Sequence, residues 1–333
     1  MKGIENISVS EAVNQHTGIA QYVETLYKLI RIRMRENPDY YILGFRGHEI
    51  YWLVRLITLG RPLIFDSLMS PYGALKEEKK MGRTGAWISG LIFIIERTIL
   101  RNCQLILTDT PNHVQYFSRT FSIQERKLLA VPVAAQEDVS APSVTHCPFA
   151  GEDTLNVLFY GSFLPLHGVP IILEAIAELK ELPLHVHFIG GTKKTLNMFN
   201  SMRKKFSLNN TSHQYWVAYD ELLQNYIQLA DVCLGGPFGN TPQSHRVITG
   251  KTTQCLSQGK ATIIGRIDTD YPFIDRKNCL LVNQGDVQSL REALAWAVNH
   301  TSELTKIGQA GQALYRQHLS VSCISDKLNK AFS

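Results

Sequence analysis

The chain has 333 residues, of which 44% are hydrophobic and 19% are charged, and its formal net charge is +5. This length suffices for two domains with separate cores, and the composition excludes a disordered or low-complexity protein. The basic residues are scattered rather than gathered in a stripe with aromatic side chains. Nucleic acid is therefore not expected as a partner, whereas an anionic substrate or an acidic membrane surface suits the charge.

The cysteines and the N-terminus indicate the compartment. The six cysteines form no C-x-x-C pair, which argues against both a zinc site and a disulfide framework. The opening MKGIENISVSEAVNQ lacks the apolar core of a signal peptide. We therefore expect a cytoplasmic protein, with access to the inner face of the membrane as an option.

The first part of the chain alternates apolar strand patterns with helical patterns, which is typical of parallel sheets covered by helices. We assign this part, 1–135, to an N-terminal Rossmann-like domain. The predicted strands are Ile4–Val9, Tyr40–Phe45, Pro62–Asp66, Gln104–Asp109 and Lys127–Pro132.

One long apolar segment, Ala86–Leu100, interrupts this series. It is too short to span a bilayer, and Glu96 and Arg97 lie within it. A buried helix is one interpretation. A helix lying in the membrane interface is the other, because basic residues flank the segment. These residues are Lys76, Lys79, Lys80, Arg83, Arg97 and Arg101.

Polar residues at the carboxyl ends of two predicted strands are candidates for contact with a ligand. Arg46 and His48 follow the strand YYILGF, and Asp66 ends the strand PLIFD. Ligands of open parallel sheets bind beyond these strand ends. Asp66 and His48 can orient or deprotonate a hydroxyl of a ligand. The alternative for each is a helix-capping or core-satisfying polar group.

A second βα series follows a stretch rich in Ser, Pro, Ala and Gly, which predicts a linker over 136–153. We expect a C-terminal Rossmann-like domain over 154–300, and helices over 301–333 that pack back toward the first domain. The resulting fold class is α/β, with two Rossmann-like domains facing each other across a cleft. The predicted strands of the second domain are Leu155–Tyr160, Leu184–Ile189, Gln214–Val217, Val232–Leu234, Ala261–Ile264 and Leu280–Val282.

Several common cofactor motifs are missing. No G-x-G-x-x-G follows the first strand of either half and there is no P-loop, which argues against a dinucleotide dehydrogenase and an NTPase. Asp268 and Asp270 form one Asp-x-Asp, which can hold a divalent metal against a diphosphate. A solvated turn is the interpretation we favour there. No metal and no cofactor are expected.

The stretch FYGSFLPLHGV leaves a strand through Gly161 and reaches Gly168 before a helical pattern. Such a turn can cradle a phosphate, because the N–H groups at a helix start are unpaired. Ser162 and His167 would then meet the anion with a hydroxyl and an imidazole. The alternative is an ordinary βα turn in which His167 packs on its neighbours.

A second glycine-rich loop follows the strand at 232–234, and a helical pattern opens near Arg246 and continues to Ser257. An anion at this helix start would lie within reach of Arg246 and Lys251. Gln254 can bond a hydroxyl of a ligand. We expect the glycine-rich loop to be flexible. The alternative for Arg246 and Lys251 is that both are surface charges.

The blocks LNVLFYGSFLPLHGVPIILEAIAEL, HFIGG, YDELLQNYIQLADVCLGGPFGNTP and KTTQCLSQGKATIIG resemble the nucleotide-binding domain of retaining glycosyltransferases of family four, which have the GT-B fold. The blocks GFRGHEI, RPLIFDSLMSPY and LILTDTPNHVQYF resemble the acceptor domain of a subgroup, with its usual first strand-helix unit missing. The resemblance implies transfer of a sugar, with retention, from a nucleotide sugar to a glycan or lipid-linked acceptor hydroxyl, without an essential metal. Surface glycan or polysaccharide assembly is the setting it implies.

The sequence departs from this family at the donor site. Ser162 and His167 stand where the family has Arg and Lys, and Arg246 and Gln254 stand where it has two glutamates. A non-catalytic GT-B scaffold or binding subunit is therefore the alternative function. A GT-B epimerase is a third option, although it would need a carboxylate pair that the sequence does not place.

Overall fold

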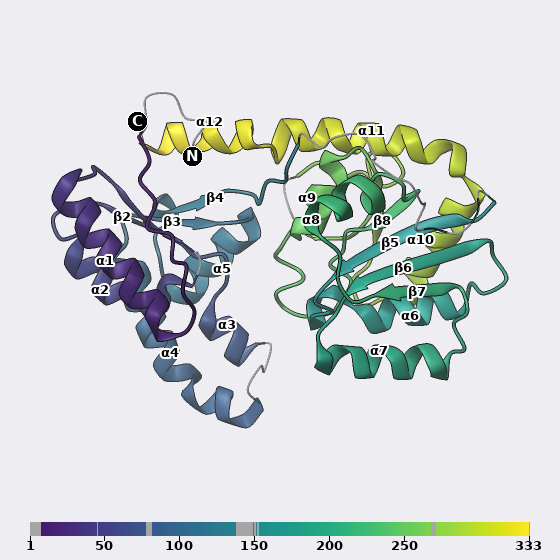
Figure 1. Ribbon diagram of the computed structural model, residues 1–333, viewed down its shortest axis with the longest axis horizontal. Coiled ribbons are helices and arrows are strands. Elements are labelled where there is room, and N and C mark those ends of the chain that lie inside the picture. Colours follow the sequence, from purple (N-terminus) through teal and green to yellow (C-terminus); the bar gives the residue numbers. More distant parts are fainter. Residues whose placement is uncertain are drawn as a thin grey trace. The chain divides into compact units, whose positions relative to one another are not determined.

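The computed structural model describes residues 8–44, 46–77, 82–137, 149, 151, 153–267 and 271–332. The chain divides into two compact units. Unit 1 comprises Met1–Pro132 together with Lys327–Ser333, and unit 2 comprises Val133–Asp326. Each unit is an α/β structure built on its own parallel sheet (Figure 1).

The sheet of unit 1 has four parallel strands in the order β1-β2-β3-β4, so each strand lies beside the next one in the sequence. Right-handed crossovers in such an order place the connecting helices on one face. The strands are β1 (Tyr41–Leu43), β2 (Leu63–Asp66), β3 (Leu105–Thr108) and β4 (Leu128–Ala130). The helices are α1 (Ile19–Arg35), α2 (Tyr51–Ile57), α3 (Pro71–Lys76), α4 (Gly82–Asn102) and α5 (Pro111–Phe121), with short 3-10 turns at Gly47–Glu49 and Glu125–Lys127.

The core of unit 1 forms where alternate residues of the strands meet α2, α4 and α5. Leu63 and Phe65 of β2 pack in one cluster with Tyr51 of α2, Ile99 of α4 and Phe117 of α5. All five side chains are almost fully buried. Ile64, between Leu63 and Phe65, is also buried but lies outside this cluster, because successive side chains of a strand point to opposite faces of the sheet.

The four described strands of unit 1 lie within the predicted ones and confirm them. The predicted strand Ile4–Val9 is not confirmed, because residues 8 and 9 are not in a strand and residues 4–7 lie outside the described residues. Phe45, the last residue of another predicted strand, also lies outside them.

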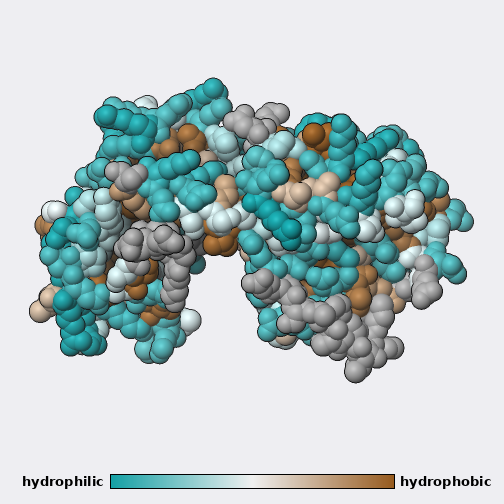
Figure 2. All heavy atoms as spheres, turned by 90° about the horizontal axis from the view of Figure 1, so that it is seen from above, coloured by the Kyte–Doolittle hydropathy of each residue, from teal (hydrophilic) through white to brown (hydrophobic). Residues whose placement is uncertain are grey.

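Helix α4 confirms a helix over the apolar segment but corrects its environment. Glu96, Ile99 and Leu100 are buried, whereas Trp87 is 90% exposed and Leu91 is 62% exposed. The helix is therefore buried on one side and exposed on the other, so the interpretation as a fully buried helix is wrong. Figure 2 shows hydrophobic residues, in brown, among the hydrophilic ones, in teal, on the face that is turned to the viewer there.

The sheet of unit 2 has six parallel strands in the order β10-β9-β8-β5-β6-β7. The order reverses between β5 and β8, because the chain adds β6 and β7 on one side of β5 and then returns to add β8, β9 and β10 on the other. The strands are β5 (Leu155–Gly161), β6 (Leu184–Gly190), β7 (Thr211–Gln214), β8 (Val232–Leu234), β9 (Ala261–Gly265) and β10 (Leu280–Val282).

Five of these six strands confirm the prediction, and β7 corrects it. The expected strand Gln214–Val217 lies three residues too late, because the polar residues Thr211 to His213 pair with β6 instead. The side chain of Arg203 bonds both the hydroxyl and the carbonyl of Thr211. The position of β7 in the sequence therefore follows from its polar pairing at the edge of the sheet and not from a hydrophobic pattern.

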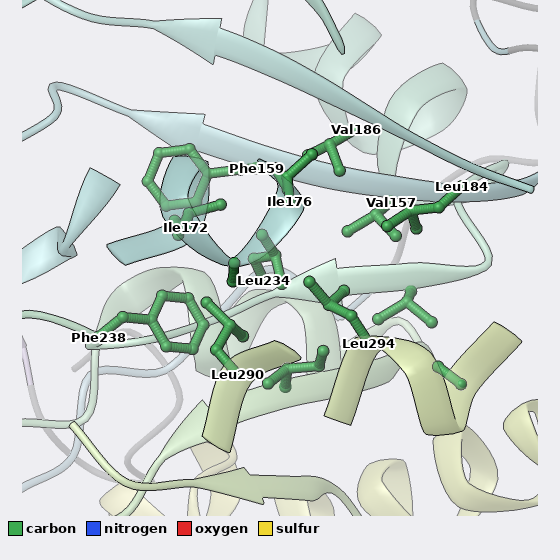
Figure 3. Packing of buried hydrophobic residues seen from close by; sticks show 14 of the residues in the cluster. Val157, Phe159, Ile172, Ile176, Leu184, Val186, Leu234, Phe238, Leu290 and Leu294 are labelled. Carbon is green, nitrogen blue, oxygen red and sulfur yellow. The ribbon is translucent and has the colours of Figure 1, made fainter. Parts of the chain in front are cut away.

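Helices cover both faces of this sheet. Val157 and Phe159 of β5 pack with Ile172, Leu290 and Leu294 from one layer of helices (Figure 3). Leu158, between them in sequence, packs with the other layer. The first layer contains α6 (Val169–Ala177), α7 (Lys193–Lys205) and α10 (Val287–Asn299), and the second contains α8 (Tyr219–Glu221), a π-helical turn (Leu222–Ile227) and α9 (Gly250–Ser257).

Two further helices end the chain. Helix α11 (Thr301–His318) packs on α9 and β9 within unit 2. Helix α12 (Val321–Phe332) follows, and its last residues group with unit 1, where the Phe332 ring lies 5.5 Å from the ring of Tyr40.

Candidate functional site

The loops that follow β5 and β8 meet where the strand order of unit 2 reverses, which is where open α/β sheets bind ligands. The Gly239 N–H donates to the Leu166 carbonyl at 3.0 Å, which joins the two loops. A Cβ at Gly168 would lie 2.5 Å from the Phe238 carbonyl carbon, and Gly168 has a φ of +66°. A glycine is therefore required for the two loops to touch.

The loop after β8 differs from the flexible segment expected there. Residues 232–239 are all buried. The hydroxyls of Thr249 and Thr252 donate to the carbonyls of Gly235 and Gly236 at 2.7 and 3.1 Å. This loop is fixed against the start of α9, so it forms one wall of the site.

Lys251 brings a positive charge to this point. It lies in the first turn of α9 and is 8% exposed. The Nζ atom of Lys251 lies 5.5 Å from the centre of the Phe159 ring. It lies 3.7 Å from the position that a Cβ on Gly161 would occupy. Among the described residues the ammonium has no carboxylate partner and makes no hydrogen bond. Burial lowers the pKa of Lys251 to about 8, so the side chain is a largely buried, unpaired cation at pH 7.

His167 lies beside this lysine. The Cε1 atom of His167 lies 3.1 Å from the position that a Cβ on Gly161 would occupy. The Nδ1 atom of His167 accepts from the Leu164 N–H at 3.3 Å. Burial, and then the charge of Lys251, lower the pKa of His167 to about 3. The imidazole is therefore neutral in the ligand-free protein and can offer Nε2–H as a donor.

The start of α9 corrects the position of Arg246. The helix begins at Gly250, four residues later than expected, because the Thr249 hydroxyl caps it by accepting from the Thr252 N–H. Arg246 lies in the turn before the helix and is half-buried. The first N–H groups of a helix have no partner within it, and Lys251 lies in this first turn.

Gln254 is buried and already bonded through both ends of its amide. Its Oε1 accepts from the Tyr160 hydroxyl at 2.7 Å, and its Nε2 donates to the Tyr219 hydroxyl at 2.7 Å. One lone pair and one N–H remain for a ligand. Ser162, by contrast, is exposed at the tip of the loop.

In unit 1 the predicted acceptor-side residues lie at the carboxyl edge of the sheet. Asp66 ends β2, and burial followed by the charge of Asp109 raises its pKa. His48 packs edge-on against Phe65 at 4.6 Å between ring centres, and burial lowers its pKa to about 4. Arg46 is exposed and pairs with Glu49 at 2.9 Å.

Sequence reasoning missed a buried pair beside Asp66. Asp109 follows β3, and one of its carboxylate oxygens bonds Nδ1 of His113 in α5. Both side chains are almost fully buried. The rule that selected Asp66, a polar residue at a strand's carboxyl end, would also have selected Asp109. The tyrosines around Gln254 carried no comparable signal, because they lie 35 and 94 residues from it in sequence.

Metal ligation finds no support in the part of the chain that the structure describes. No group of three or more His, Cys, Asp or Glu side chains is arranged there to hold a metal ion. The Asp268–Asp270 motif lies outside the described residues.

Solved structures with the same arrangement of elements are glycosyltransferases. Sucrose-phosphate synthase from Thermosynechococcus elongatus matches with a TM-score of 0.73 and 13% identity, over 95% of this chain and 79% of the other. HepE from Anabaena in complex with UDP-glucose matches with a TM-score of 0.70 and 12% identity, over 95% and 84%. The chain shares the GT-B fold.

A UDP-forming trehalose-phosphate synthase from Burkholderia xenovorans has the same GT-B fold, with a TM-score of 0.65 and 10% identity, over 94% of this chain and 78% of the other. No protein-family model matches the sequence, and no curated protein matches it. None of the described helices is both long and apolar enough to cross a membrane.

Proposed function

We propose that this GT-B protein is a glycosyltransferase that takes its sugar from a nucleotide-sugar donor bound by unit 2. The observation that carries the proposal is Lys251, a cation that is 8% exposed and lacks an anionic partner among the described residues, at the point where the strand order reverses. A buried charge without a partner is costly unless a ligand supplies the opposite charge. A diphosphate would supply it.

The chemistry of transfer explains why a cation belongs there. When the bond between the sugar and the diphosphate breaks, negative charge develops on the diphosphate. Lys251 and the N–H groups at the start of α9 would stabilise that charge, with Arg246 adding a second cation from the preceding turn. The turn from Gly161 to Gly168 would lie against the phosphates, with Ser162 and neutral His167 as hydrogen-bond donors.

The rest of the donor would extend along α9. Gln254, held by its two tyrosines, would bond a ribose hydroxyl with its remaining N–H or lone pair. UDP-sugars are the first donors to test, because one neighbour is recorded with UDP-glucose. No metal and no cofactor take part in this proposal.

On the acceptor side, we propose that Asp66 and His48 orient or deprotonate a hydroxyl of a glycan or lipid-linked acceptor, with Arg46 nearby. Retention at the anomeric carbon and a role in surface glycan assembly are the finer parts of the proposal, and they rest on the resemblance of the sequence. Peripheral membrane contact would use the exposed apolar residues of α4, such as Trp87 and Leu91. Vesicle flotation of the wild type and of Trp87→Glu tests that contact.

The function is tested by incubating the protein with UDP-glucose, UDP-N-acetylglucosamine and GDP-mannose. We expect release of the nucleoside diphosphate by slow donor hydrolysis, and thermal stabilisation by the same diphosphate. The anomeric configuration of the released sugar reports retention. Absence of binding by any nucleotide would refute the donor site.

A non-catalytic GT-B binding subunit is the second candidate. The observation that favours it is Gln254, a neutral and doubly bonded side chain where the family has a glutamate. Nucleotide binding without hydrolysis of any donor would support this candidate over the enzyme.

A further inference from the structure

Unit 1 contains a cavity of about 400 Å³, which is lined in part by residues that follow β1 and β2. Its size lies within the range of small-molecule sites, roughly 300 to 1,000 Å³. Five apolar side chains line it, together with Ser70, Arg46, His48, Glu49 and Glu96; the apolar ones are Met69, Pro71, Ala74, Ile92 and Ile95. An apolar site with a few polar groups is typical of a ligand pocket.

Glu96 is the unusual member of this lining. It lies in the apolar helix α4 and is 1% exposed. One carboxylate oxygen, Oε2, accepts from the Tyr72 N–H at 2.9 Å, and the Ser70 hydroxyl also bonds the carboxylate. The other oxygen, Oε1, has no hydrogen-bond partner of suitable geometry among the described residues. Leaving a buried polar atom without a partner costs free energy, and a ligand that bonds this oxygen would recover it.

His48, another residue of the lining, also has a buried polar atom without a hydrogen-bond partner in the described part of the chain. Its Nε2 is buried and has no hydrogen-bond partner among the described residues. Burial keeps the imidazole neutral at pH 7, with a pKa of about 4, and raises the pKa of Glu96 to about 7. The two groups thus offer hydrogen-bonding capacity with little fixed charge.

These properties select the chemistry of the ligand. A hydroxyl both donates and accepts, so it matches a neutral imidazole and a carboxyl in either protonation state. A phosphate would bring two or more negative charges beside Glu96. An ammonium would find no full countercharge, because Glu49 already pairs with Arg46.

We propose that this cavity binds an uncharged apolar alcohol, with the hydrocarbon against Ile92, Ile95 and Ala74 and the hydroxyl between Glu96 and His48. The role of this alcohol as the acceptor, or as the apolar part of the acceptor, rests on the proposed function. Its binding does not, because all of the residues involved belong to unit 1.

Calorimetric titration with geraniol, without any donor present, tests the proposal. We expect measurable binding of geraniol, about tenfold weaker binding of geranyl methyl ether, which cannot donate a hydrogen bond, and weaker binding of both geranyl phosphate and geranylamine. Tighter binding of the phosphate or the amine than of geraniol would overturn the proposal, and so would no binding of geraniol up to millimolar concentration.

A matched pair of variants on α4 locates the site. Ile95 lines the cavity, whereas Ile94 is 61% exposed and does not line it. Ile95→Ala should weaken geraniol binding about tenfold, Ala74→Phe should abolish it by filling the space, and Ile94→Ala should leave it unchanged. Equal effects of the two isoleucine variants would contradict the proposal.

A parallel titration with UDP separates the two claims. Loss of UDP binding with geraniol binding intact would refute only the donor site, and the reverse result would refute only the alcohol site.

Discussion

Replacing Lys251 by methionine should change stability and ligand binding in opposite directions. The ammonium is buried beside Gly161 and Phe159 without an anionic partner among the described residues, and burial lowers its pKa from 10.5 to about 8. A shift of about 2.5 units corresponds to about 3 kcal/mol of unfavourable free energy for holding the charged form in the folded state. Lys251→Met should recover up to about 3 kcal/mol, because methionine keeps most of the packing.

The pH dependence gives this prediction its sign. Below pH 8 the lysine is charged in both folded and unfolded chains, so the full penalty is present. Between pH 8 and about 10.5 the unfolded chain binds more protons than the folded one, and the stability of the wild type rises with pH relative to the variant. The difference between the two proteins should therefore be largest near pH 7 and shrink as the pH approaches 10.

Urea unfolding of the two proteins at pH 7 and pH 9.5 measures this difference, with the exposed Lys306→Met as the control. Titration with UDP at pH 7 measures the other half of the prediction. Removing one member of a buried charge pair costs about 2 to 5 kcal/mol of binding free energy, so the variant should bind UDP at least about 30-fold more weakly. A variant that is less stable and binds UDP normally would refute the reasoning.

Three further predictions follow from the same wall of unit 2. His167→Leu should weaken UDP binding about tenfold, by loss of one hydrogen-bond donor, and by the same factor at pH 5.5 and pH 7, since the pKa of His167 is about 3. A loss that grows at low pH, seen by calorimetry, would show that the diphosphate protonates the histidine. Gln254→Leu should lower the free energy of unfolding by about 2 kcal/mol, because the Tyr160 hydroxyl loses its partner, whereas unchanged urea stability would mean that the bond contributes nothing. Gly168→Ala should cost about 2 to 4 kcal/mol, because its φ is positive and the new Cβ meets the backbone of Phe238; a variant as stable as the wild type, by the same assay, would show that the loop can move.

The strands were largely predictable from the sequence, and the reason is physical. Strands such as β5 and β9 are buried on both faces, so their residues form short apolar runs that turn residues bound. β7 was misplaced because it is an edge strand of polar residues, held by pairing with β6 and by Arg203. No hydrophobic period marks such a strand.

The candidate site was predictable only in part. The turn from Gly161 to Gly168 could be predicted because it follows an apolar strand and precedes a helical pattern. Lys251 could be predicted because it lies near the start of a helical pattern. Local patterns of the sequence mark both positions. The start of α9 was placed too early, because only the structure shows that Thr249 caps the helix. From the sequence, Glu96 was only a charged residue within an apolar segment. A sequence does not reveal whether a buried carboxylate has a hydrogen-bond partner or lines a cavity.

The most direct test of the account is a crystal structure of the protein soaked with UDP. The account predicts that diphosphate oxygens lie within hydrogen-bonding distance, about 2.7 to 3.2 Å, of Lys251 Nζ, with the phosphates against the turn from Gly161 to Gly168 and the start of α9. UDP bound elsewhere, with Lys251 touching no phosphate, would contradict it.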